Sequence, residues 1–120
     1  MHITRFKNNP EFTAGDKTTL RQLLHPHTHK LPINFSMAHA RLAVGKKSLP
    51  HRLDSTEVYY ILQGKGRMHI DDENETVQVG DTVYIPPKSR QFIENIGSEK
   101  LVFICVVSPE WREENEIVEK

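Results

Sequence analysis

The sequence predicts an all-β fold of antiparallel strands that ends in a short C-terminal helix. Strand-length segments rich in Val, Ile, Tyr and Phe recur along the chain, and short turns containing Gly, Pro, Asn or Asp separate them. The longest apolar run, residues 101–107, has seven residues, which suits a buried strand and is much too short to span a bilayer. A chain of 120 residues is large enough for one domain with one core.

Composition argues against several classes of partner. Sixteen basic and sixteen acidic residues give a net charge of zero, so the sequence favours neither nucleic acid nor a membrane as a partner. The N-terminus lacks the apolar core of a secretion signal. The single cysteine, Cys105, cannot form an internal disulfide and lies in an apolar segment, where cysteine usually packs as a small core residue. We therefore expect a cytoplasmic protein whose partner is a small, neutral ligand or another protein.

Residues 1–32 are expected to form an N-terminal arm and an edge strand. Residues 1–17 are polar and are interrupted by Pro10 and Gly15, so they are predicted to be irregular. Residues 18–24 alternate in character and are predicted to form the strand.

Three histidines follow this strand at every second position, namely His25, His27 and His29. An extended backbone would place the three imidazoles on one side, where they can bind a transition metal. The alternative is a polar, proline-containing loop without a ligand. No acidic residue or cysteine stands nearby to complete a metal site, which favours the loop. The sequence leaves open whether this segment folds over the barrel mouth and donates an imidazole.

The residues that carry the chemistry lie in two stretches, residues 45–64 and 80–95. In the first stretch, His51 and position 53 point to one face of an extended segment because successive strand side chains alternate. Three short polar residues then form a bend, and Glu57 returns to the same face at the start of the next strand. The pattern predicts an imidazole and a carboxylate in one cavity.

These two stretches resemble the two sequence motifs of the cupin superfamily, which are G-x5-H-x-H-x3-E-x6-G and G-x5-P-x-G-x2-H-x3-N. The matching residues are Gly45, His51, Glu57 and Gly64 in the first motif, and Gly80, Pro86 and Asn95 in the second. The resemblance covers residues 33–108. It implies a small single-domain cupin of the cupin 2 conserved barrel type, an antiparallel β-barrel with jelly-roll topology.

Three positions depart from the cupin motifs. Leu53 stands where the family has its second metal-binding histidine, Gln91 stands where it has the third, and Lys88 replaces a glycine. The resemblance therefore implies His51, Glu57 and Gln91 as the ligands of a divalent transition metal, Fe, Mn, Ni or Zn. A glutamine carbonyl is a weak neutral donor, so we expect the metal to be weakly held or absent.

The resemblance also implies which faces of the strands line the pocket. In the strand over residues 33–44, the small side chains of Ala38 and Ala40 would face inward and leave room for a ligand. In the next strand the inward positions would include Tyr59 as well as Glu57. In the last barrel strand Phe103 would line the cavity, and we expect Leu53, Tyr59 and Phe103 to form the substrate pocket.

Residues 109–120 are predicted to form a short C-terminal helix. Ser108 suits the N-cap, Pro109 suits the first helical position, and acidic residues follow in the first turn. Trp111 and Val118 would pack this helix against the barrel. A functional alternative is that the helix acts as a lid over the barrel mouth.

Two classes of function fit these observations. The first is a metal-dependent enzyme, an oxygenase, isomerase or decarboxylase that acts on a small polar organic molecule, with His51 and Glu57 as its catalytic residues. Even without a metal, an imidazole and a carboxylate in a partly apolar cavity can move protons. The second is a non-enzymatic cupin that binds a sugar or an organic acid without a functional metal.

Exposed sheet edges need a cover, and cupins are often dimers, so we also expect a homodimer.

Overall fold

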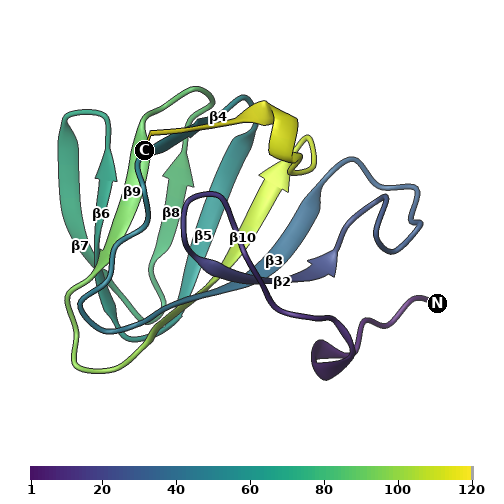
Figure 1. Ribbon diagram of the computed structural model, residues 1–120, viewed down its shortest axis with the longest axis horizontal. Helices are drawn as coiled ribbons and strands as arrows, with labels where there is room; N and C mark the ends of the chain where they lie inside the picture. The colour runs from purple at the N-terminus through teal and green to yellow at the C-terminus, as the bar shows by residue number, and fades with distance from the viewer. Residues whose placement is uncertain (120) are drawn as a thin grey trace.

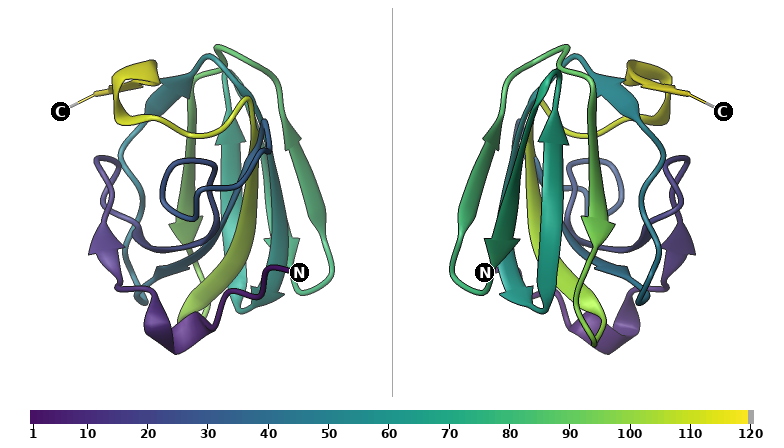
Figure 2. Two further views of the ribbon diagram at one scale, coloured as in Figure 1. Left: turned by 90° about the vertical axis from the view of Figure 1, so that its right-hand side faces the viewer. Right: turned by 90° about the vertical axis from the view of Figure 1, so that its left-hand side faces the viewer.

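The computed structural model of the protein describes residues 1–119. This part of the chain contains eleven β-strands and two 3-10 helices, η1 (Phe6–Asn8) and η2 (Glu113–Asn115). The strands form two antiparallel sheets that face each other (Figure 1, Figure 2). The all-β barrel expected from the sequence is therefore confirmed.

The two sheets divide the strands unequally. The six-stranded sheet has the order β1 (Phe12–Thr13), β2 (Thr19–Leu24), β3 (Ser36–Leu42), β10 (Leu101–Ser108), β5 (Thr56–Gln63) and β8 (Thr82–Ile85). The five-stranded sheet has the order β11 (Glu116–Val118), β4 (His51–Leu53), β9 (Gln91–Asn95), β6 (Lys65–Ile70) and β7 (Glu73–Gln78). Both orders also bring together strands that are distant in the sequence, such as β3 with β10 and β4 with β9, as a jelly roll requires.

Alternation along the strands places the core between the sheets, and it follows the predicted parity. In β3, Ala38, Ala40 and Leu42 are buried while the residues between them are half-buried. In β5, Tyr59 is buried and its neighbour Tyr60 is 46% exposed. The fully enclosed side chains pack into one apolar cluster, which includes Ile61, Ile93, Leu101 and Phe103. This rigid double layer fixes the backbone from which the inward polar groups project.

Gly64 lies where the chain crosses from β5 in one sheet to β6 in the other. Its φ is +87°, and a Cβ there would lie 2.7 Å from the carbonyl oxygen of Lys100. Gly64→Ala is therefore expected to lower the free energy of unfolding by about 1–3 kcal/mol, measured by urea denaturation. Gly80→Ala is the matched control, because Gly80 has φ +91° but nothing within 4 Å of its Cβ position. Equal losses in the two variants would contradict a role for the close approach to Lys100.

The other motif positions have structural roles in turns. Lys88, which replaces the family's glycine, adopts a left-handed φ of 68°, so the turn keeps the conformation that glycine adopts most easily. Asn95 holds the turn before β10, because its side-chain nitrogen donates to the carbonyl oxygens of Leu42 and Glu99 at 3.0 and 2.9 Å. The motif residues outside the cavity thus serve the fold.

The prediction of a C-terminal helix over residues 109–120 is wrong for the part of this segment that is described. Strand β10 continues through Ser108, so this residue caps no helix, and the segment after it contains only η2 and β11. Strand β11 pairs with β4, and Figure 1 shows the yellow C-terminal segment crossing one end of the molecule to reach it. A helix of this length is marginal by itself, whereas pairing with β4 satisfies backbone hydrogen bonds and covers a sheet edge. Residue 120 lies outside the described residues.

The N-terminal strand also differs from its predicted position. Strand β2 is not at the sheet edge, because β1 pairs with it on one side and β3 on the other. It therefore covers an edge of its own sheet, and the predicted homodimer stays a prediction.

Within residues 1–119, no helix has the length and apolar character needed to cross a bilayer.

Candidate functional site

An interior cavity opens between the two sheets beneath the C-terminal segment. Its volume of about 30 Å³ gives room for roughly two water molecules. The imidazole and the three carboxyl groups that border it come from four segments of the chain. His51 and Glu57 come from β4 and β5, as the sequence predicts, while Asp16 and Glu116 come from the N-terminal loop and β11.

His51 is buried, and its orientation is set by the backbone. Its Nδ1 lies 2.9 Å from the carbonyl oxygen of Leu49. A carbonyl oxygen only accepts, so Nδ1 carries the proton and Nε2 of the neutral ring keeps its lone pair. The Asp16 Oδ2 atom lies 3.7 Å from Nδ1 on the same side. The ring is therefore held so that a positive charge on it would be stabilised by a buried carboxylate.

Glu57 is joined to Gln91 and Tyr59 by a chain of buried hydrogen bonds. The Tyr59 hydroxyl donates to Gln91 Oε1 at 3.2 Å, and Gln91 Nε2 donates to Glu57 Oε1 at 2.9 Å. Among the hydrogen bonds of residues 1–119, none is donated to the other carboxyl oxygen, Oε2. Because the carboxyl group borders the cavity, Oε2 is the oxygen that remains for a ligand.

Burial sets the protonation of these side chains. It raises the pKa of Glu57 to about 7, and the carboxylates of Asp16 and Glu116 raise this pKa further, while His51 and the Gln91 hydrogen bond lower it. Burial also raises the pKa of the Tyr59 hydroxyl and of the Cys105 thiol well above their ordinary values. The tyrosine and the cysteine are thus neutral near pH 7, whereas the Glu57 carboxyl is divided between its two forms.

Sequence reasoning did not find Asp16 or Glu116. Asp16 Oδ1 accepts hydrogen bonds from the backbone nitrogen and the hydroxyl of Thr18, at 3.1 and 2.7 Å, which fixes the carboxyl group in its loop. Glu116 Oε2 accepts a hydrogen bond from Trp111 Nε1 at 2.8 Å. The Asp-x-Thr pattern signals a local turn, but nothing in the sequence signals that either carboxyl group reaches the cavity.

The proposed metal ligands do not form a suitable donor set. Both amide atoms of Gln91 are engaged, one by Tyr59 and one by Glu57. In the part of the chain that is described, no group of three or more His, Cys, Asp and Glu side chains is arranged to hold a metal ion. The residues therefore do not fit a tightly bound transition metal, and the predicted site at His51, Glu57 and Gln91 stays a prediction.

The predicted pocket residues are only partly brought together. Tyr59 and Phe103 border the cavity, with their ring centroids 4.5 Å apart. Leu53 is buried but does not border the cavity, and Gln91 reaches it only through its hydrogen-bond partners. Leu53 shares the buried face of β4 with His51, but the cavity does not extend as far along the strand as Leu53.

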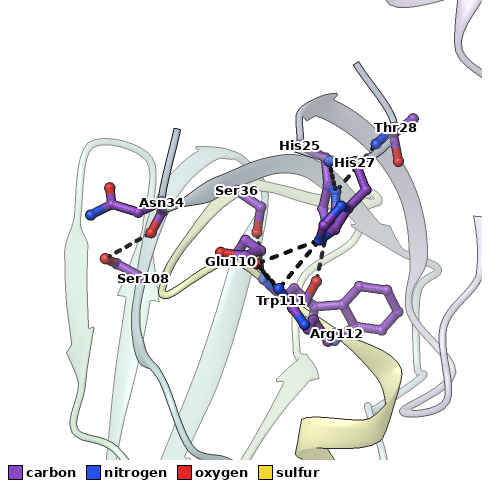
Figure 3. A network of polar contacts seen from close by, with 9 residues as sticks. All are labelled: His25, His27, Thr28, Asn34, Ser36, Ser108, Glu110, Trp111 and Arg112. Atoms are coloured by element: carbon purple, nitrogen blue, oxygen red, sulfur yellow. Dashed lines mark hydrogen bonds and ion pairs between the residues drawn. The ribbon is translucent and has the colours of Figure 1, made fainter. Parts of the chain in front are cut away.

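Trp111 closes the mouth of the cavity. Its backbone nitrogen donates to Ser36 Oγ at 2.8 Å, and its carbonyl oxygen accepts from His25 Nε2 at 2.8 Å. Figure 3 shows these contacts tying the C-terminal segment to β3 and to the histidine loop. Trp111 borders both the interior cavity and a surface groove on its other side, so it forms the wall between them.

The three histidines form an ordered loop. His25 Nδ1 accepts from the backbone nitrogens of His27 and Thr28 at 3.2 and 3.5 Å. His29 Nδ1 accepts from the backbone nitrogen of His25, and His29 Nε2 lies 2.9 Å from Asn9 Oδ1. These ring nitrogens are used by the loop itself, which agrees with the loop alternative. The segment does lie at the barrel mouth, but it touches the site through the Trp111 backbone.

Comparisons with known proteins agree with this architecture. Residues 38–107 match the family described as Cupin domain. An uncharacterized protein of Methanocaldococcus jannaschii is 41% identical over 118 residues, which cover 97% of this chain and 94% of that protein. A Cupin 2 conserved barrel domain protein from Salinispora arenicola superposes with a TM-score of 0.76 at 21% identity, covering 90% of this chain and 88% of that chain. A predicted oxalate decarboxylase from Thermotoga maritima superposes with a TM-score of 0.76 at 22% identity, covering 91% of this chain and 99% of that chain.

Proposed function

This chain belongs to the cupin domain family, and from that premise we propose that it is an enzyme of the isomerase type that moves a proton within a small polar organic molecule. The observation that carries the proposal is the pair formed by His51 and Glu57 at one enclosed cavity. One is an imidazole with a free lone pair, and the other is a carboxyl group with a pKa of about 7. A carboxyl group whose pKa lies near the working pH is an effective general acid.

The roles follow from which atoms are free. His51 Nε2 takes a proton from a carbon next to the substrate carbonyl, while the protonated Glu57 donates its Oε2 proton to the carbonyl oxygen. The enol that results is neutral, and the positive imidazolium is stabilised by Asp16, whose Oδ2 lies 3.7 Å from Nδ1. When the deprotonated carbon bears a hydroxyl group, this enol is an enediol. The imidazolium then gives its proton to the former carbonyl carbon, and the hydroxyl on the deprotonated carbon gives its proton to Glu57, so that this carbon becomes the carbonyl and both residues are restored. Without that hydroxyl the steps reverse, and the C–H hydrogen exchanges with solvent.

The neighbouring side chains support this division of roles. The Gln91 amide fixes the Glu57 carboxyl group through Oε1, so that Oε2 points to the space that a substrate enters. Tyr59 fixes the amide in turn. Trp111 separates the cavity from the surface groove, which keeps water away from the reacting groups. No step in this scheme requires a metal ion, in keeping with the poor fit of the donor set.

Exchange of carbon-bound hydrogen in D2O tests the proposal whatever product the enzyme forms. Protein purified without an affinity tag is treated with EDTA, its metal content is measured, and ¹H NMR follows the loss of C–H signals in aminoacetone, hydroxyacetone and pyruvate. These three-carbon ketones differ only in the group next to the carbonyl. We expect exchange faster than in buffer for at least one ketone, and we expect it to persist in the metal-free protein.

Two other results would contradict the proposal in different ways. Loss of exchange on metal removal, with recovery on adding one divalent metal, would support the metal-dependent enzyme instead. The absence of exchange with all three ketones, together with a raised melting temperature on adding one of them, would support a binding protein. That second candidate is favoured by the small volume of the closed cavity, which suits retention of a ligand better than rapid release.

A further inference from the structure

We infer that the interior cavity selects a small organic cation, a molecule that bears a protonated amine, and rejects carboxylates and phosphates. This inference names the substrate class of the proposed site and so rests on the proposed function for its catalytic meaning. The binding that the inference predicts does not require the chain to be an enzyme. It stands on the charge of the cavity lining, on an unused hydrogen-bond acceptor and on the aromatic wall.

Acidic side chains outnumber basic ones at the cavity. Three carboxyl groups border it, those of Asp16, Glu57 and Glu116, and each comes from a different part of the chain. Among the described residues that border the cavity there is no Lys or Arg, and His51 is the one group able to carry a positive charge. A carboxylate ligand would add a fourth acid to this enclosed space, whereas an ammonium group would compensate the charges already there.

One hydrogen-bond acceptor at the cavity has no donor. The side-chain oxygen of Gln22, a residue that borders the cavity, is buried and lacks a hydrogen-bond partner in the described chain. A buried acceptor without a donor is unfavourable. An ammonium group brings three N–H donors and no acceptor, so it complements this lining.

Aromatic rings complete the environment. Tyr59, Phe103 and Trp111 border the same cavity as the carboxyl groups, and a cation is attracted to the face of an aromatic ring. On the outer side of Trp111 lies a surface groove of about 360 Å³, which Glu113 and Glu114 border. Displacement of Trp111 would join the cavity to this groove, so that the ammonium group and the carbonyl of one ligand both lie beside the carboxyl groups and His51.

Trp111 also provides the measurement, because it is the one tryptophan in the sequence. Its fluorescence is titrated with ethanolamine, ethylene glycol and glycolate, which share a two-carbon hydroxyl frame and carry a positive, a neutral and a negative second group. We expect ethanolamine to bind at least about tenfold more tightly than ethylene glycol, and glycolate to bind more weakly than either. Equal affinities for ethanolamine and ethylene glycol, a preference for glycolate, or no response to ethanolamine at millimolar concentrations would each overturn the inference.

Variants locate the site. Glu116→Gln removes one charge while its amide oxygen can still accept from Trp111 Nε1, and it should weaken ethanolamine binding by about tenfold. Gln22→Leu removes the unused acceptor and should also weaken binding. Glu94→Gln is the matched control, because Glu94 pairs with His69 outside the cavity, at 2.6 Å. Unfolding curves establish that each variant is folded, and unchanged ethanolamine affinity in both cavity variants would overturn the inference.

The outcomes separate this inference from the proposed function. Selective ethanolamine binding without exchange of any ketone would uphold the cation site and count against the enzyme. Exchange of pyruvate with no exchange of aminoacetone would uphold proton transfer and overturn the selectivity.

Discussion

Replacement of His51 by Asn is expected to lower the rate of protein-catalysed C–H exchange by about 10²–10⁴-fold, the range typical of removing a general base. The substitution takes away the Nε2 lone pair while keeping a polar side chain that can donate to the Leu49 carbonyl oxygen. The rate is measured by ¹H NMR in D2O with the ketone that exchanges fastest in the wild-type protein.

His69→Asn is the matched control for this substitution. His69 lies on β6, stacks on Phe92 with ring centroids 4.0 Å apart and pairs with Glu94, so it shares the chemistry of His51 but not its cavity. We expect its exchange rate to equal that of the wild type. If His51→Asn also kept the wild-type rate, the assignment of His51 as the base would be wrong.

Glu57→Gln is expected to abolish a pH dependence of stability worth about 3 kcal/mol. The folded protein raises the pKa of Glu57 from 4.5 to about 7, chiefly because the side chain is buried, with Asp16 and Glu116 adding to the effect against His51 and Gln91. Between these two values the folded state binds the proton more tightly than the unfolded chain does. The free energy of unfolding therefore falls as the pH rises through this window, and the difference corresponds to about 3 kcal/mol above pH 7.

Glutamine has nearly the same shape as glutamate and does not ionise, so the variant escapes this loss. We expect Glu57→Gln to be more stable than the wild type at pH 8 by about 3 kcal/mol and close to it at pH 4.5, as measured by urea denaturation. Glu94→Gln, at a partly exposed site outside the cavity, should show no such gain at pH 8. A wild-type protein that is equally stable at pH 5 and pH 8 would contradict the raised pKa.

Much of the barrel could be predicted because its signals are local. The period-two pattern of β3 and β5 predicts which side chains point inward, and Ala40, Tyr59 and Ile61 are buried as it predicts. The spacing of His51 and Glu57 likewise sets both on one side of the chain, and both border the cavity. Such relations depend on the backbone of a few consecutive residues, which the sequence specifies directly.

The C-terminal segment shows where local signals fail. Ser108 and Pro109 begin a stretch with the features of a helix start, yet Glu116–Val118 forms a strand on β4. Two hydrogen bonds that join distant parts of the chain, from Trp111 to Ser36 and from His25 to Trp111, hold the segment over the cavity. Helix propensity is a weak preference that such tertiary contacts readily override.

The sequence by itself determined the cupin barrel, the inward parity of its strands and the presence of an imidazole and a carboxyl group within it. Only the tertiary structure decided that Gln91 is bonded to Glu57 rather than free for a metal, and that Asp16 and Glu116 complete an acidic cavity beneath Trp111. The physical reason is distance along the chain. Alternation and turn chemistry act between near neighbours, whereas the charge of an enclosed space depends on which remote segments the folded sheets bring to it.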